Sequence, residues 1–174
     1  MTHLVKMAWS RVRRRDARRS LGSEEDYRLR FVREVEEIGR DLAEISPIPK
    51  SRIDAISIEL LGFARLRADL LDARVRDGRI VEAHGDLRPE HVCLLSEPVI
   101  IDCLEFDPEL RLLDPADELS FLTVECELAG GPPFIEQVLF ETYSELTSDW
   151  PPDPWCGSTS RSGLSSAPRS ASGT

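Results

Sequence analysis

Two aspartates that flank a short hairpin pattern are the residues of this sequence best suited to catalysis. Asp86 follows a short mixed segment with strand character, and Asp102 follows the β-branched run at 99–101. The apolar runs at 92–95 and 99–101, separated by Ser-Glu-Pro, predict a β-hairpin between them. A hairpin brings its two ends together, so we expect both carboxylates at one edge. Phosphoryl transfer requires such a pair, because one carboxylate orients and deprotonates a hydroxyl and another holds Mg²⁺.

The histidines near these aspartates allow a second interpretation. His84, Asp86, His91 and Asp102 are donor types that suit a transition metal, so a metal-dependent hydrolase is an alternative. No second His-rich motif completes a familiar ligand set. None of the four cysteines forms a Cys-x-x-Cys pair, which argues against a zinc knuckle.

Three motifs in this region resemble those of one enzyme family. His-Gly-Asp-Leu at 84–87 resembles the HGD-L catalytic loop of the aminoglycoside phosphotransferase and choline-kinase-like enzymes, which are relatives of protein kinases. Ile-Asp-Cys-Leu-Glu at 101–105 resembles their metal-binding segment, the counterpart of the protein-kinase D-F-G. Residues 113–119 are similar to the D-P-A-x-D-L helix start that follows. The order and spacing agree over about 79–129, and Asp-Leu-Arg-Pro-Glu-His resembles a bacterial subgroup, some of whose members are fused to a P-loop ATPase domain.

The resemblance implies a role for each matching residue. Asp86 would be the catalytic base and Asp102 the Mg²⁺ ligand, with ATP as the phosphoryl donor and a small hydroxylated molecule as the acceptor. His84 would be a member of the catalytic loop, packed rather than reactive. Asp114 would help to pin this loop from the following helix. Glu105 would either support the metal-binding segment or be a solvated charge.

His91 departs from the family pattern. Five residues after the catalytic Asp the family usually has Asn, which holds a second metal position. A neutral imidazole also binds divalent metals, but Mg²⁺ prefers oxygen ligands. His91 therefore either tunes the metal and nucleotide site that it shares with Asp102, or marks weakened chemistry.

An enzyme of this family also needs a nucleotide-binding lobe, which the sequence does not predict. That lobe supplies a sheet, a loop over the phosphates and a strand lysine. Lys6 and Lys50 are the two lysines of the chain, neither lies in a strand pattern, and no Gly-rich loop occurs. We therefore expect a kinase-like C-terminal lobe without its N-terminal lobe. Such a chain would be active only if another chain supplies the missing lobe, and the alternative is a non-catalytic remnant or partner-binding module.

The periodicity predicts an α+β fold that is mainly helical. Apolar spacing indicates helices over 24–45 and 52–77, a further helix that opens at Asp114-Pro115, and a last helix over about 134–147. The first two helices are expected to bury six residues: Phe31, Ile38, Leu42, Leu60, Phe63 and Leu70.

Composition divides the chain into three parts and limits its partners. A basic segment (1–22) precedes the lobe (23–150), and a Ser/Gly-rich tail (151–174) with a disordered composition follows it. The net charge of -10 argues against nucleic-acid binding. No apolar run approaches the roughly 20 residues that span a bilayer, and the start lacks a secretory signal. We therefore expect no membrane partner and a cytoplasmic location.

Overall fold

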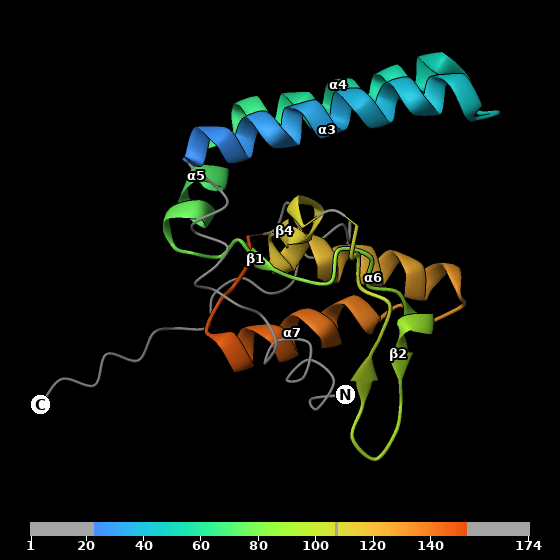
Figure 1. Cartoon of the computed structure of the whole chain (residues 1–174), viewed down its shortest axis with the longest axis vertical. Coiled ribbons are helices and arrows are strands. Elements are labelled where there is room, and N and C mark those ends of the chain that lie inside the picture. The colour runs from blue at the N-terminus through green and yellow to red at the C-terminus, as the bar shows by residue number, and fades with distance from the viewer. Residues whose placement is uncertain (1–22, 107, 153–174) are drawn as a thin grey trace, which may run out of the picture.

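The computed structural model describes residues 23–106 and 108–152, and within them the protein is an α+β fold that is mainly helical (Figure 1). The predicted basic segment 1–22 and residues 153–174 of the predicted tail lie outside this part. The elements are, in chain order, α3 (Glu24–Ile45), α4 (Lys50–Leu66), α5 (Ala68–Arg76), β1 (Val81–Glu82), η1 (Pro89–His91), β2 (Val92–Cys93), β3 (Val99–Ile100), η2 (Glu109–Arg111), β4 (Leu112–Leu113), α6 (Pro115–Leu128) and α7 (Ile135–Thr147).

Helices α3 and α4 form a hairpin that lies over the rest of the fold (Figure 1). A capping box begins α3, because Ser23 Oγ accepts from the backbone N–H of Asp26 (3.2 Å) and the Asp26 carboxylate accepts from Ser23 N (2.6 Å). The two helices approach closely at Gly39, where an added Cβ would lie 2.8 Å from Ser57 Oγ. An alanine at Gly39 would therefore require the Ser57 hydroxyl to rotate, because the Ser57 Cβ lies at an ordinary contact distance of 3.9 Å.

The predicted helix over 52–77 is wrong as a single element, because the chain bends at Arg67. This residue has φ −118° and ψ 28°, which ends α4 and starts α5. After the bend, Leu71 is buried in the core and Arg74 is buried among carboxylates. Tertiary packing of these two side chains opposes a local preference for one straight helix.

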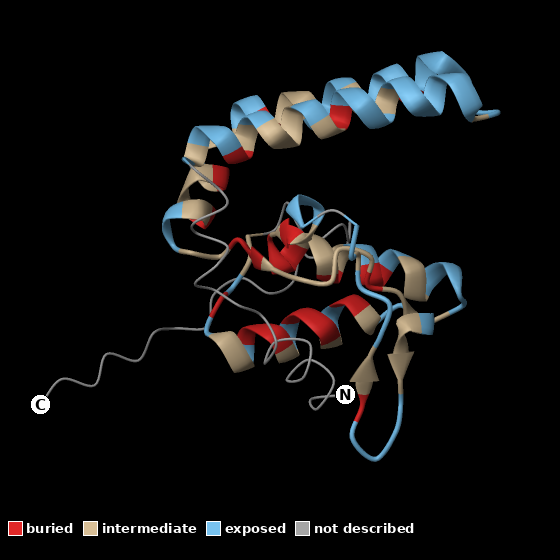
Figure 2. Ribbon diagram, viewed as in Figure 1, coloured by how far each residue is buried: buried red, intermediate tan, exposed pale blue. Residues whose placement is uncertain are grey.

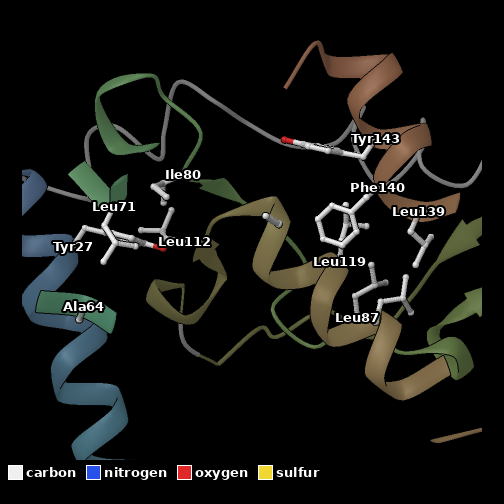
Figure 3. Packing of buried hydrophobic residues seen from close by; sticks show 12 residues of the cluster. Tyr27, Ala64, Leu71, Ile80, Leu87, Leu112, Leu119, Leu139, Phe140 and Tyr143 are labelled. Atoms are coloured by element: carbon white, nitrogen blue, oxygen red, sulfur yellow. The ribbon is translucent and has the colours of Figure 1, made fainter. Parts of the chain in front are cut away.

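The core runs from α3 and α5 through the two-residue strands to α6 and α7 (Figure 3). Twelve buried side chains form it: Tyr27, Ala64, Leu71, Ile80, Leu87, Leu112, Ala116, Leu119, Leu122, Leu139, Phe140 and Tyr143.

Three of the six residues predicted to be buried in the first two helices are exposed. Ile38 is 57% exposed, Leu42 is 38% exposed and Leu60 is 42% exposed, so the prediction is wrong for them. The other three are partly buried and pack against the core: Phe31, Phe63 and Leu70. Ile38 and Leu42 lie in the half of α3 nearest the turn to α4, and this end of the α3–α4 hairpin is largely exposed (Figure 2).

Two small antiparallel sheets frame the loop at residues 83–91, hereafter the 83–91 loop. β2 pairs with β3, with Val92 opposite Ile100, which confirms the predicted hairpin. β1 pairs with β4, with Val81 opposite Leu113, and this pairing was not predicted. The loop therefore leaves one sheet at β1 and enters the other through η1 and β2.

Helices α6 and α7 pack side by side (Figure 1). Asp114 caps α6 by accepting from Ala116 N (2.9 Å), and Pro115 occupies the first turn, as predicted. The last helix agrees with its predicted range to within one residue. Among the residues described here, no helix is long and apolar enough to cross a membrane.

Candidate functional site

The 83–91 loop turns sharply at Gly85, and only glycine suits that position. Gly85 has φ +85°, a conformation that side chains disfavour. An added Cβ would also lie 2.9 Å from Leu104 Cδ1 and 3.2 Å from the carbonyl oxygen of Leu110. The His-Gly-Asp spacing therefore follows from a tight turn packed against the 101–106 segment.

Glu118 of α6 holds this turn from below. Its Oε1 accepts hydrogen bonds from the backbone N–H groups of His84 (2.9 Å) and Gly85 (2.7 Å). Burial raises the pKa of Glu118 to about 7, against the lowering effect of these two hydrogen bonds. Sequence reasoning missed Glu118, although it stands at the acidic fifth position of the D-P-A-x-D-L phrase.

His84 links the loop to the segment that carries Asp102. Its Nε2 lies 2.7 Å from the carbonyl oxygen of Ile101, and its Nδ1 lies 3.3 Å from Asp86 N. A carbonyl only accepts, so Nε2 carries the hydrogen and Nδ1 accepts from the backbone. Both ring nitrogens are therefore engaged, and His84 joins the 83–91 loop to the segment that carries Asp102.

His91 lies between the two aspartates. Its Nδ1 lies 2.8 Å from the carbonyl oxygen of Asp86, and its Nε2 lies 3.6 Å from Asp102 Oδ2. The ring stacks on that of His84, with centroids 5.4 Å apart and planes 28° from parallel. The structure thus brings the backbone of Asp86 and the carboxylate of Asp102 to opposite ends of one imidazole ring.

The two aspartates differ in their surroundings. The Asp86 carboxylate is partly buried and accepts from Arg88 Nε at 2.8 Å. The Asp102 side chain is 81% exposed, and its backbone has φ +61°, a left-handed conformation that Asp tolerates better than most residues. Asp86 is therefore held in place by a cation, whereas Asp102 faces solvent beside His91.

Arg88 is a further residue of this site that sequence reasoning did not single out. Its guanidinium contacts Asp86 and lies 3.9 Å from Glu90. It also lies over the ring of Phe121 on α6, 5.8 Å from the centroid. Arg88 therefore ties the Asp86 carboxylate to both the loop and α6.

Arg111 supports the 101–106 segment from the other side. It donates to the carbonyl oxygen of Leu104 and to Glu82 Oε1, both at 2.7 Å. Leu104 N also donates to the carbonyl oxygen of His84 (3.2 Å). These contacts fix the segment that follows Asp102 against the 83–91 loop.

The two predicted supporting residues lie away from the loop. Asp114 makes its hydrogen bonds to Arg74 and Ala116, so the contact that pins the loop comes from Glu118 instead. Glu105 is exposed, and no hydrogen bond or ion pair joins it to another residue of the described ranges. Its position agrees with a solvated charge.

Asp114 belongs instead to a buried charge network centred on Arg74. The Arg74 guanidinium donates to both oxygens of Asp114 (2.6 and 2.7 Å) and to both oxygens of Asp149 (2.6 and 2.8 Å). Tyr143 OH also donates to Asp149. Burial alone would raise the pKa of Asp149, but the hydrogen bonds from Arg74 and Tyr143 hold this pKa below its ordinary value. The network fastens α5 to the start of α6 and to the end of α7.

The set of four ligands considered for a hydrolase does not assemble. No three His, Cys, Asp or Glu side chains in the described part of the chain form a cluster that could hold a metal ion. His84 has both ring nitrogens engaged, which leaves His91 and Asp102 as neighbouring donors. Two protein ligands suit a metal that also binds a substrate such as a nucleotide phosphate.

Comparison with known proteins gives relatives of part of the chain. Uncharacterized proteins of Mycobacterium bovis and of two Mycobacterium tuberculosis strains, CDC 1551 and H37Rv, are each 41% identical to it over 69 residues. The match covers 39% of this chain and 14% of the length of those relatives. No family model matches the chain, and no solved structure matches it.

Proposed function

We propose that this chain carries the acceptor and metal side of the active site of an ATP- and Mg²⁺-dependent phosphotransferase that acts on a hydroxyl of a small molecule. The observation that supports this most directly is His91, which joins the Asp86 loop to the Asp102 carboxylate. Phosphoryl transfer depends mainly on positioning and charge, and it needs a base and a metal-binding carboxylate near one another.

Asp86 is the proposed general base. Its carboxylate is oriented by Arg88, and its backbone is held on both sides, by His84 at the amide and by His91 at the carbonyl. A fixed orientation favours a general base, because the base must lie within hydrogen-bond reach of the acceptor hydroxyl when the acceptor binds.

Asp102 is the proposed metal ligand. It is exposed, so a metal ion carried by nucleotide phosphates reaches it without rearrangement of the core. When bound, the metal would neutralise charge on the transferred phosphoryl group. The nucleotide-covering lobe belongs to the proposal as a separate partner, supplied by another chain, in the cytoplasm where ATP is plentiful.

Transfer of labelled phosphate from ATP to a panel of aminoglycosides, sugars and amino alcohols, measured with the chain and the partner that supplies the nucleotide-covering lobe, tests this function. We expect Asp86→Asn to lose at least about 100-fold in rate, as general-base removal does. Asp41→Asn, an exposed carboxylate on α3, is the matched control and should keep full activity. Equal rates for the chain and for Asp86→Asn would refute the assignment of Asp86 as base.

A non-catalytic binding module is the second candidate, favoured by the exposed apolar residues on the outer half of α3 and α4. Melting temperature separates the two functions. A clear rise on adding MgATP supports the phosphotransferase, because a ligand that binds only the folded state stabilises it. An unchanged melting temperature, together with no transfer in the presence of the nucleotide-covering partner, supports the binding module.

A further inference from the structure

The tautomer of His91 is fixed by its surroundings. Nδ1 lies 2.8 Å from the carbonyl oxygen of Asp86, and a carbonyl oxygen only accepts, so Nδ1 carries a hydrogen. In the neutral ring the lone pair is then on Nε2. The His91 side chain is 13% exposed and stacks on His84, so the ring is held in this orientation. Metal-binding histidines are commonly oriented in this way, by a hydrogen bond from the other ring nitrogen to a backbone carbonyl.

A second metal-donor atom lies near His91 Nε2. Asp102 Oδ2 lies 3.6 Å away, which is too long for a hydrogen bond. Two ligands of one metal ion, each at about 2.1 Å, are about 3.0–3.6 Å apart for angles of about 90–120° at the metal. The observed separation therefore matches a pair of neighbouring ligands of a single ion.

The donor set selects the kind of ion. An imidazole nitrogen paired with a carboxylate suits a first-row transition ion, whereas Mg²⁺ prefers oxygen donors and keeps several waters. We propose that His91 Nε2 and Asp102 Oδ2 bind a divalent transition ion such as Mn²⁺ in preference to Mg²⁺. This inference deepens the proposed function, on which it rests for the remaining ligands, the phosphate oxygens of the nucleotide and water.

Paramagnetic broadening by Mn²⁺ tests the site in the full 174-residue chain without an activity assay. Small amounts of Mn²⁺ are added to ¹⁵N-labelled protein, and the loss of each amide and imidazole signal is followed by NMR, first alone and then against an excess of Mg²⁺. We expect signals of His91 and of the residues beside Asp102 to broaden first and to resist Mg²⁺.

Three variants make the test specific. His91→Asn replaces nitrogen by an amide oxygen, and we expect at least about tenfold weaker Mn²⁺ binding and ready displacement by Mg²⁺. Asp102→Asn should weaken binding by a similar factor, and because this side chain is exposed the substitution leaves the fold intact. Glu105→Gln is the matched control, since it removes an exposed negative charge of the same segment and should leave Mn²⁺ binding unchanged.

The outcomes separate this inference from the proposed function. Broadening spread over the acidic helices and equal in all variants, or Mg²⁺ displacing Mn²⁺ equally well from the chain and from His91→Asn, would show that His91 and Asp102 form only an ion pair and overturn the inference. Localised Mn²⁺ binding without any phosphoryl transfer in the presence of the nucleotide-covering partner would keep the metal site and refute the phosphotransferase. Phosphoryl transfer with Mg²⁺, without Mn²⁺ broadening at His91, would keep the phosphotransferase and overturn the proposed metal site.

Discussion

Replacing Glu118 by glutamine removes a largely buried charge and keeps an oxygen that accepts from the 83–91 loop. In the native chain, Glu118 Oε1 accepts from His84 N and Gly85 N, and burial raises the pKa of this carboxyl from its ordinary 4.5 to about 7. The amide oxygen of Glu118→Gln can accept the same two hydrogen bonds at every pH. The variant therefore isolates the cost of the charge.

The sign and size of the effect follow from this pKa. Because the folded state binds the Glu118 proton more tightly than the unfolded state, the free energy of unfolding falls as pH rises from 4.5 to about 7 and is level above that. A change of this size in pKa corresponds to about 3 kcal/mol. Glu118 as a residue keeps partial solvent exposure, which screens the charge, so we expect a loss of about 2 kcal/mol.

Urea unfolding followed by far-UV circular dichroism at pH 5, 6, 7 and 8 measures this directly. Glu118→Gln should be more stable than the native chain by about 0.5 kcal/mol at pH 5 and by about 2 kcal/mol at pH 8, since other titrating groups cancel in the difference. Glu118→Ala is the contrasting variant and should be less stable, by about 1–3 kcal/mol at pH 5, because it leaves two backbone donors without an acceptor. A constant difference between the native chain and Glu118→Gln across this range would refute the reasoning.

Two further predictions use matched pairs of residues and the same urea assay. Arg74→Met should cost about 3–5 kcal/mol because it leaves the carboxylates of the buried network unpaired, whereas Arg76→Met, on the exposed side of α5, should cost less than about 0.5 kcal/mol. Equal costs would contradict the buried network. Gly85→Ala should destabilise by more than about 1 kcal/mol, because of its positive φ and the 2.9 Å contact, whereas Gly62→Ala, inside α4 with open space around it, should stabilise by about 0.5–1 kcal/mol. The same sign for both glycine variants would contradict the turn geometry.

The sequence predicts well those features that depend on neighbouring residues. The Ser23 capping box, the Asp114-Pro115 helix start and the hairpin at 92–101 each rest on a local pattern, and the structure has all three. The pairing of β1 with β4 joins segments about thirty residues apart, and two-residue strands carry no periodicity that would reveal it.

The candidate site shows the same contrast: the sequence reveals residues that belong to local motifs, but it does not reveal residues whose role depends on tertiary packing. His84, Asp86, His91 and Asp102 were found from their motifs, and the structure places them within one connected set of contacts. Glu118 was missed because a single acid on an amphipathic helix is usually a surface charge, and its role depends on how α6 packs under the loop.

Val35 and Ile38 give the sharpest test of the α3–α4 arrangement, because sequence periodicity treats them alike and the structure does not. Both belong to one apolar stripe of α3, yet Val35 is 8% exposed and Ile38 is 57% exposed. Val35→Ala should therefore cost about 1.5 kcal/mol, and Ile38→Ala should lie within about 0.5 kcal/mol of the native chain, in urea unfolding at low protein concentration. If Ile38→Ala instead costs as much as Val35→Ala, the outer half of α3 is covered in solution, and this would contradict the exposure of Ile38. If that cost appears only as protein concentration rises, the cover is a second copy of the chain, because only an intermolecular contact makes stability depend on concentration.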